Sequence, residues 1–367
     1  MAASWRVRAV RLPDGEAIDA GVTPAGRWTP RPPPDAELLP GRFVLPGLVD
    51  AHCHLSIGAG QDGPAGLGVD AARAAAAQAR AEGVTGIRDV GSPGSVTLKL
   101  LPDDGGDLVA CGRFLAPEGG YFRSLHSPVS AAELVPAALV EIAAGASWVK
   151  LIGDSLHLDG TGRSAHSRPD RTMPADPAHA MPAYRVADVR RLADAVHAAG
   201  ARVAVHTTSR YVRELIDARV DSVEHGYGLD EAGLAALADR GGAWTPTLCV
   251  ALGFGRGPDP EQRRSWHERR QRLAWLLPLA VRLGVTIMTG TDTFGSIPRE
   301  VALMTQLGLA PCDALAAATT AARGYLGFAA LGDGEPADLV SFDDDPRDDP
   351  AVLGRPAAVL VGGRRVR

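Results

Sequence analysis

The sequence predicts an α/β protein: a (β/α)8 TIM barrel with a small β-sandwich domain built from both chain ends. Three observations lead to this fold class. The 367 residues exceed one minimal domain, and an apolar content of 46% is ample for a large core. Through the middle of the chain, helical stretches that stop at a glycine alternate with short β-prone runs. Both ends of the chain are β-prone and contain no such alternation.

The two ends are expected to form the sandwich, residues 1–45 from the N-terminal side and residues 330–367 from the C-terminal side. In the first segment, residues 5–10 alternate apolar with basic side chains, as a half-buried strand does. In the second, residues 337–342 and 358–363 have the same β-prone character. Residues 46–329 remain for the barrel.

The repeated unit of the middle region is a helix, a glycine and a strand. Gly83, Gly200 and Gly284 each follow a helical stretch and precede a β-prone run. A glycine at this point adopts the left-handed conformation without a Cβ clash and so ends the helix. We expect eight strands that end near residues 54, 90, 115, 151, 206, 225, 247 and 291, with weaker periodicity at the third and seventh. Residues 153–183 are expected to form a long polar loop.

Composition and charge restrict the kind of partner. A formal net charge of −5 without a basic stripe or polybasic cluster argues against nucleic acid and membrane surfaces. The first residues contain no uninterrupted apolar run, so we expect no signal peptide and a cytoplasmic protein. The four cysteines, Cys53, Cys111, Cys249 and Cys312, lie too far apart for a zinc finger or a disulfide framework. A small-molecule substrate remains, and the sequence leaves the oligomeric state, a homo-oligomer included, open.

Metal-competent side chains stand where four of the expected strands end. His52 and His54 lie two residues apart at the end of the first strand and therefore share a face. His206, His225 and Asp292 end the fifth, sixth and eighth strands. A lone buried histidine is more often a satisfied core residue than a ligand, but strand ends of one barrel converge in space. As a set, these residues predict a metal site.

Lys150 is the unusual residue of the fourth strand. It stands in the apolar run 146–152, although the chain has only one other lysine, Lys99, and draws its remaining positive charge from arginine. A surface lysine with a buried stem is the ordinary interpretation, and it fits poorly in a chain that uses arginine elsewhere. A desolvated lysine can lose its proton, whereas arginine cannot. The neutral amine can then add CO2 and become a carbamate able to bridge two cations.

The sequence resembles the amidohydrolase superfamily, in its imidazolonepropionase-like and metal-dependent prolidase (Xaa-Pro dipeptidase) branch. The similarity covers nearly the whole chain and rests on five segments: residues 44–54, 84–91, 222–226, 290–293 and 334–340. It implies the barrel with its sandwich and an activity on carbon–nitrogen bonds. Two departures lie where substrate would bind, namely Gly119-Gly120-Tyr121 in place of a Gly-Gly-His and the loop 153–183.

The resemblance also implies a binuclear metal centre. Its ligands would fall into three groups: His52, His54 and Asp292 on one ion, His206 and His225 on the second, and Lys150, carboxylated by CO2, between them. Zinc is the favoured metal, and manganese, iron and cobalt suit the same ligands. Two cations would lower the pKa of a shared water and make hydroxide available. Asp292 would move the water's proton to the leaving nitrogen.

Four further residues are candidates for substrate binding. Tyr121, His126 and Tyr227 follow strand ends and could hydrogen-bond a carbonyl or carboxylate, with packing or loop structure as equal alternatives. Arg88 could hold a carboxylate through two hydrogen bonds, although an internal ion pair with the neighbouring Asp89 is the more ordinary role.

Three functions compete at this level. The first is a metal-dependent amidohydrolase that cleaves an amide or peptide-like bond of a small substrate, such as a dipeptide or a cyclic amide. The second is a deaminase or related hydrolase that acts on a ring carbon; the resemblance associates that chemistry with one metal and no strand-4 lysine. The third is a non-catalytic barrel, which the complete ligand set disfavours.

Overall fold

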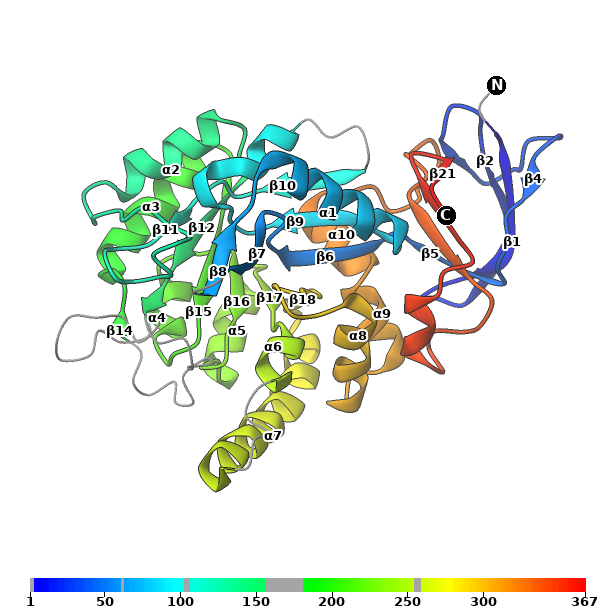
Figure 1. Ribbon diagram of the computed structural model, residues 1–367. Helices are drawn as coiled ribbons and strands as arrows, with labels where there is room; N and C mark the ends of the chain where they lie inside the picture. The colour runs from blue at the N-terminus through cyan, green and yellow to red at the C-terminus, as the bar shows by residue number, and fades with distance from the viewer. Residues whose placement is uncertain (1–2, 61–62, 102–105, 156–180, 254–258) are drawn as a thin grey trace.

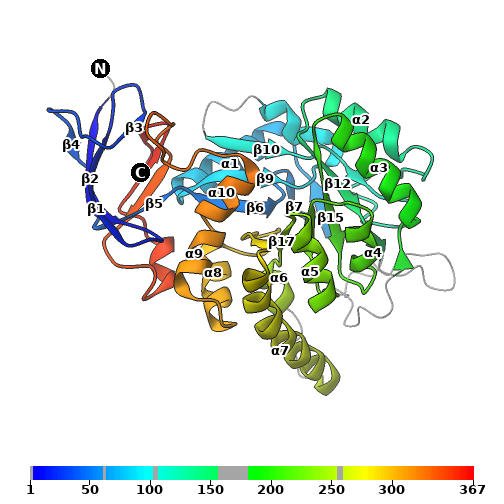
Figure 2. The ribbon, with the colours of Figure 1, turned by 180° about the vertical axis from the view of Figure 1, so that it is seen from behind.

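The computed structural model describes residues 3–60, 63–101, 106–155, 181–253 and 259–367. Figure 1 shows two parts: a curled β-sheet that holds both chain ends, and a larger body in which helices surround parallel strands. The reverse view in Figure 2 shows helix α7 projecting from the bottom of the larger body.

The terminal sheet joins strands from both ends of the chain. Its hydrogen-bonded order is β21-β20-β19-β5-β1-β2-β3, and β4 pairs with β1. The N-terminal strands are β1 (Trp5–Arg11), β2 (Glu16–Val22), β3 (Trp28–Thr29), β4 (Glu37–Leu38) and β5 (Phe43–Pro46). The C-terminal strands are β19 (Leu339–Phe342), β20 (Ala358–Val361) and β21 (Arg364–Arg365). The two ends meet where β5 pairs antiparallel with β19.

The sheet curls so that its two ends close over one apolar core. Trp5, Val22, Trp28, Leu339 and Leu360 belong to this core and are all buried. The indole Nε1 of Trp5 donates to the carbonyl oxygen of Gly363 at 3.1 Å, which fastens the first strand to the last turn. Both chain ends are thus needed for this core, as the β-prone termini predicted.

The larger body contains two ladders of parallel strands. One has the order β10-β9-β6 and the other β11-β12-β15-β16-β17-β18. Their bounds are β6 (Leu48–Cys53), β9 (Val84–Asp89), β10 (Asp107–Ala110), β11 (Phe114–Leu115), β12 (Trp148–Ile152), β15 (Arg202–Thr207), β16 (Ser222–His225), β17 (Ala243–Thr245) and β18 (Thr286–Ile287). The strands of each ladder run parallel, as expected for strands joined by helical crossovers.

Helices and short hairpins fill the connections between these strands. The helices are α1 (Val69–Ala81), η1 (Pro93–Leu100), α2 (Leu134–Ala143), α3 (Val186–Ala198), α4 (Val212–Asp217), α5 (Glu231–Asp239), α6 (Leu248–Gly253), α7 (Pro260–Leu283), α8 (Ile297–Gln306), α9 (Pro311–Ala317) and α10 (Thr320–Leu326), with η4 (Pro350–Gly354) in the terminal part. Two antiparallel strand pairs also belong to the body, β7 (Ile57–Gly60) with β8 (Gly63–Gly66), and β13 (Asp154–Ser155) with β14 (Met181–Pro182).

The two ladders meet at the first and last strands of the body. Cys53 and Asp292 form a parallel bridge. The amide of Asp292 donates to the carbonyl of His52 at 2.7 Å, and the amide of Ala51 donates to that of Thr289 at 2.9 Å. These backbone contacts place the segment after β18 directly beside the end of β6.

The expected helix stops are present at the glycines. Gly83, Gly200 and Gly284 follow α1, α3 and α7 with φ of 99°, 77° and 85°. The third strand is split into β10 and β11, and the last two strands have only three and two residues, so the weak periodicity of this region reflects short pairing. Of the expected loop 153–183, residues 156–180 lie outside the described residues. Within the described part of the chain, no helix has the length and apolar character needed to cross a membrane.

Arg323 of α10 joins several elements from a fully buried position. Its guanidinium donates to the carbonyl of Gly47 at 2.8 Å, to the hydroxyl of Thr85 at 2.5 Å and to the carboxylate of Asp107 at 2.8 Å. Asp338, just before β19, lies 3.8 Å away. One cation thereby ties α10 to β9, β10 and the junction with the terminal sheet.

We predict that Arg323→Met lowers the free energy of unfolding by about 3–5 kcal/mol, because it leaves buried acceptors without their donor. Urea unfolding at neutral pH measures the effect. Arg73→Met is the matched control, since the Arg73–Asp70 pair is exposed and worth about 1 kcal/mol or less. A loss in Arg323→Met no larger than in the control would contradict the structural role of this residue.

Candidate metal centre

Four histidines and one aspartate from separate strand ends converge in the larger body. His52 ends β6, with His54 two residues on, His206 lies in β15 and His225 ends β16. Adjacent imidazole rings lie close, with centroids 4.9 Å apart for His52 and His225 and 4.5 Å apart for His206 and His225. One ligand atom each of His52, His225 and Asp292 lie within 4.8 Å of one another. The strand ends thus bring together residues up to 240 positions apart in sequence.

Three of these imidazoles are held through Nδ1. The Nδ1 of His54 donates to the carbonyl of Gly91 at 2.8 Å, and that of His52 lies 2.8 Å from a carboxylate oxygen of Glu224. The Nδ1 of His225 lies 2.7 Å from the hydroxyl of Thr247. A carbonyl or a carboxylate can only accept, so the proton of His52 and of His54 sits on Nδ1 and leaves Nε2 with a lone pair. This is the arrangement found for histidines that bind a metal through Nε2.

Burial keeps these imidazoles neutral. It lowers the pKa of His52 and His225 well below the ordinary value and lowers the pKa of His54 as well. Nearby positive charge acts in the same direction, from Lys150 on His52 and from His206 on His225. Neutral imidazole is the form that binds a cation.

Three residues of the site have left-handed backbone conformations that L side chains rarely adopt. The φ values are 65° at His225, 45° at Thr247 and 56° at Asp292. Each costs of order 1–3 kcal/mol and persists only where the surroundings determine it. His225 is the last residue of β16, Thr247 lies two residues after β17, and Asp292 lies five residues after β18. The backbone is therefore strained at two of the candidate metal ligands, His225 and Asp292, and at Thr247, which contacts His225.

Lys150 lies in the interior of β12 and is 1% exposed. Its Nζ has no hydrogen-bond partner among the described residues. Burial lowers the pKa of this amine, and the nearby Glu224 carboxylate opposes that shift. An unpartnered ammonium would be costly here, so the surroundings favour the neutral amine. That amine is a nucleophile without a structural role of its own.

Two buried aspartates brace the segments that carry the ligands. Asp50 accepts hydrogen bonds from the amides of His52 and Thr291 and from the Thr291 hydroxyl. Asp89 accepts from the amides of Leu55 and Gly91 and from a threonine hydroxyl. Burial raises the pKa of each carboxyl to about 7. Their hydrogen bonds determine where the backbone turns on either side of the two β6 histidines.

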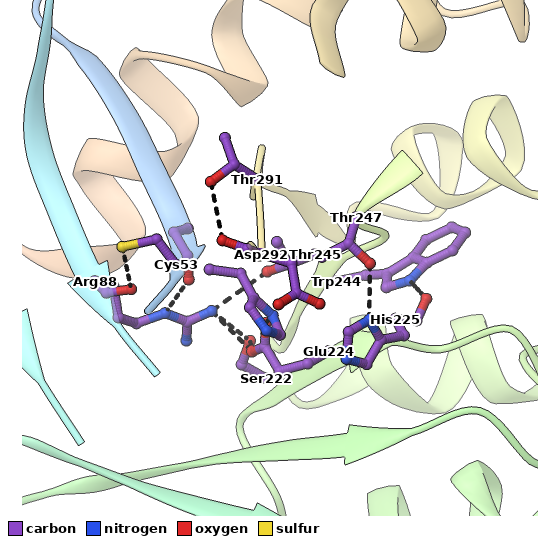
Figure 3. Close-up of polar contacts among 12 residues, drawn as sticks. Cys53, Arg88, Ser222, Glu224, His225, Trp244, Thr245, Thr247, Thr291 and Asp292 are labelled. Carbon is purple, nitrogen blue, oxygen red and sulfur yellow. Dashed lines mark hydrogen bonds and ion pairs between the residues drawn. The ribbon is translucent and has the colours of Figure 1, made fainter. Parts of the chain in front are cut away.

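Arg88 differs from its expected role in substrate binding. Its side chain is fully buried in the interior of the strands. The guanidinium donates to Glu224 at 2.8 Å and to the carbonyl of Ala51 at 2.6 Å, and it lies over the ring of Trp148. Figure 3 shows it directed at Glu224 and Ser222. The internal ion pair, which was the alternative, describes its position better, with Glu224 rather than Asp89 as the partner.

The other substrate candidates lie at the edge of the centre in different settings. Tyr121 stacks against Phe114 with centroids 4.8 Å apart and lies 6.1 Å from the ring of His206. Tyr227 lies 5.8 Å from the ring of His225, and its hydroxyl is 3.3 Å from Thr247. Burial raises the pKa of both phenols, so both hydroxyls keep their protons near neutral pH. Both rings therefore lie beside the candidate ligands, Tyr121 next to His206 and Tyr227 next to His225.

His126 is engaged within its own loop. Its Nδ1 lies 2.9 Å from the carbonyl of Phe122 and its Nε2 3.2 Å from that of Pro117. The structure therefore favours the loop role over substrate contact for His126. The histidines expected in the polar loop, His157, His166 and His179, lie outside the described residues.

Sequence interpretation missed three residues that matter here. Glu224 and Thr247 hold metal-competent imidazoles, but neither position carries a spacing that marks it in advance. Arg269 of α7 is half-buried, donates to the carbonyl of Ala251 at 2.8 Å and lies 5.9 Å from the ring of Tyr227. No described carboxylate pairs with it. Arg269 lies 42 residues after Tyr227 on a separate helix, so the sequence gives no indication of this contact.

Comparison with known proteins adds a family and a set of similar folds. A model of the amidohydrolase family matches residues 43–366. An uncharacterized protein of Mycobacterium tuberculosis (strain H37Rv) is 33% identical over 371 residues, which cover 98% of this chain and 94% of that protein. Among solved structures, a Xaa-Pro dipeptidase with methionine bound in its active site has a TM-score of 0.78 at 19% identity, with both chains fully covered. An A. niger ochratoxinase has a TM-score of 0.77 at 18% identity, and the match covers 100% of this chain and 96% of the ochratoxinase chain.

The buried histidines predict a pH dependence of stability in the metal-free protein. Histidine in the unfolded chain binds a proton below about pH 6.5, whereas His52 and His225 stay neutral to lower pH because their pKa is lowered. The unfolded state binds more protons across this window, so these residues make the free energy of unfolding fall as the pH drops below about 6.5. Asp50 and Asp89, with raised pKa, act in the opposite direction.

The test is therefore a comparison of variants by urea unfolding at about pH 7.5 and pH 5. We expect the metal-free His225→Asn variant to lose less stability between the two pH values than the wild type, because asparagine does not titrate and tolerates a positive φ. His267→Asn, at an exposed position of α7, is the control and should keep the wild-type difference. An equal pH effect in wild type and His225→Asn would show that this imidazole does not titrate as its burial requires.

Proposed function

The chain belongs to the amidohydrolase family and is a hydrolase that acts on carbon–nitrogen bonds; from that premise we propose that it cleaves an amide or peptide-like bond of a small substrate with the help of divalent metal ions. One observation carries the proposal. His52, His225 and Asp292 present ligand atoms to a common point, and second residues already hold the far side of both imidazoles.

The residues fit a metal centre by their chemistry. Imidazole nitrogen and carboxylate oxygen are ligands that zinc takes in catalytic sites. Held Nδ1 atoms leave the Nε2 lone pairs free at neutral pH. The buried Lys150 amine without a partner is accounted for if it carries a CO2-derived carbamate, whose two oxygens suit two cations. We therefore propose two divalent ions, zinc being favoured, held by His52, His54, Lys150, His206, His225 and Asp292.

The chain's own residues define the reaction. When bound, the ions would supply Lewis-acid activation of a water and of the amide carbonyl. Asp292 is half-buried, with a carboxylate oxygen 3.5 Å from the Nε2 of His54; we propose that it accepts the water's proton and passes it to the leaving nitrogen. Tyr121 and Tyr227 keep their phenolic protons and can donate hydrogen bonds to substrate oxygens.

The substrate class follows from the groups around the centre and from the relatives. The Arg269 guanidinium lies over the ring of Tyr227 and pairs with no carboxylate among the described residues. Its positive charge suits a substrate with a carboxylate, such as a dipeptide or an N-acyl amino acid. A solved prolidase complexed with N-methylphosphonate-L-proline has the same fold, with a TM-score of 0.76 at 21% identity over the full length of both chains. We propose a dipeptide or related small amide.

The proposal includes the complete architecture. We propose that the two parallel ladders form one closed (β/α)8 barrel over residues 46–329, with residues 1–45 and 330–367 as the accompanying β-domain. The bridge between Cys53 and Asp292 supports closure at one seam. At the other, β10 and β11 are consecutive along the chain, and Gly112, which lies between them, accepts a hydrogen bond at 2.8 Å from the amide of Ser92, after β9.

The activity test is a screen of dipeptides, N-acyl amino acids and cyclic amides with zinc- or manganese-loaded protein. We expect hydrolysis of at least one class, and we expect Asp292→Asn to lower its turnover by about 100- to 10,000-fold, as loss of general acid–base help does. Asparagine keeps the shape and tolerates the positive φ at this position. Release of ammonia from ring amines alone would replace amide hydrolysis with the deaminase alternative. Normal turnover in Asp292→Asn would remove its proposed role.

The metal test concerns Lys150. We expect close to two divalent ions per chain in the purified protein, and the loss of at least one, together with the activity, in Lys150→Ala. Lys150→Arg should be equally inactive, because a guanidinium stays protonated and cannot become a carbamate. Short carboxylic acids in excess should restore part of the activity of the alanine variant. Full metal content in either variant, measured by elemental analysis, would contradict the bridging role.

A further inference from the structure

A complete ion pair lies beneath the candidate metal centre, in the interior of the parallel strands. Arg88 of β9 and Glu224 of β16 are both fully buried, and their charged atoms are 2.8 Å apart. The guanidinium also contacts the carbonyl of Ala51 in β6 at 2.6 Å, the hydroxyl of Thr245 in β17 at 3.3 Å and the ring of Trp148 in β12 at 4.6 Å. One side chain thus contacts four strands besides its own.

The position of this pair is unusual for a structural feature. The interior of a parallel-stranded body is ordinarily filled by branched apolar side chains. A buried ion pair costs several kcal/mol per charge to desolvate, and apolar residues of the same size would be as stable or more so. The Nη1 of Arg88 even lacks a partner among the described residues. Stability alone therefore gives no reason for the pair, and a role at the neighbouring site does.

The contacts of Glu224 indicate that role. One carboxylate oxygen accepts hydrogen bonds from the Arg88 guanidinium at 2.8 Å and from the Ser222 hydroxyl at 2.6 Å. The other lies 2.8 Å from the Nδ1 of His52. Arg88 and Ser222 therefore occupy one oxygen and direct the other at the imidazole. Figure 3 shows Arg88 and Ser222 both converging on Glu224.

We propose that Arg88 and Glu224 form a positioning unit for His52, and that this unit sets the metal affinity of the centre. The inference rests on the proposed metal-dependent function. Glu224 holds the proton of His52 on Nδ1 and, as an anion, raises the basicity of Nε2. Arg88 keeps Glu224 in the one orientation that allows this. Arg88 also donates a hydrogen bond to the carbonyl of Ala51, one residue before His52. This bond fixes the position of the Glu224 carboxylate relative to the His52 imidazole.

Glu224→Gln tests the unit with almost no change of shape. Arg88 can only donate, so the amide oxygen of the glutamine must face Arg88 and the NH2 group must face His52. That donor moves the histidine proton to Nε2, the atom that would bind the metal. We expect zinc affinity, measured by competition with a chelator, to fall by about 10- to 100-fold, as it does when such outer partners are lost.

The double variant Glu224→Gln with Arg88→Met distinguishes positioning from simple loss of packing. Without Arg88, the glutamine amide can flip and present its oxygen to His52, so part of the zinc affinity lost in Glu224→Gln should return. Thermal stability should not return, because a second buried side chain has been replaced. Thr245→Val is the matched control: it removes a contact of Arg88 but none of Glu224, and zinc affinity should stay within about twofold of wild type.

The outcomes separate the two proposals. A wild-type protein that binds no zinc contradicts the proposed function itself. Zinc binding by the wild type with unchanged affinity in Glu224→Gln overturns the positioning unit and leaves the metal centre intact. A double variant that binds zinc more weakly than Glu224→Gln also overturns it. If the double variant fails to fold, the comparison of Glu224→Gln with Thr245→Val decides.

Discussion

Every polar group that this protein buries at its strand ends needs a partner, and that constraint organises the structure around the candidate centre. An imidazole, carboxylate or amine removed from water without hydrogen bonds costs several kcal/mol. Here the far side of each of three histidines is held, by Gly91, Glu224 and Thr247. The near sides face one another. The one buried amine left without a partner among the described residues, Lys150, lies within this same group. The unpartnered amine of Lys150 and the near sides of the imidazoles are groups that a metal centre would satisfy.

The partners are themselves supported, which makes the network continuous. Glu224 is held by Arg88 and Ser222, and Thr247 precedes α6, whose first amides donate to the buried Glu300 of α8. Asp50 connects the amide of His52 to that of Thr291, on opposite sides of the seam between β6 and the last strand. Side chains several residues away from the centre thereby determine its geometry. Left-handed backbone at His225 and Asp292 shows that this geometry is imposed against local preference.

The terminal sheet and the larger body are linked through the same kind of contact. Arg323 connects α10 to the start of β6 and to β9, and it lies near Asp338 at the entry to the terminal sheet. The first strand of the body, which carries two of the histidines, therefore starts from a fixed point. Since β5 and β6 are separated by a single residue, Gly47, the terminal sheet bears directly on where His52 and His54 lie.

The alternation of helices and parallel strands, the glycine helix stops, the β-prone ends and the polar residues that close the strands can all be predicted from the amino-acid sequence. These features are local, because they depend on side-chain periodicity and on residue types at strand ends. What those residues contact depends on how distant strands and helices pack. Arg88 and Glu224 are 136 positions apart, and Arg269 reaches Tyr227, in the turn after β16, from helix α7. The sequence offered a substrate carboxylate or an internal ion pair with Asp89 as partners of Arg88. The fold instead buries it against Glu224, since a partner for a buried charge is set by which strands pack together, and no local pattern records that.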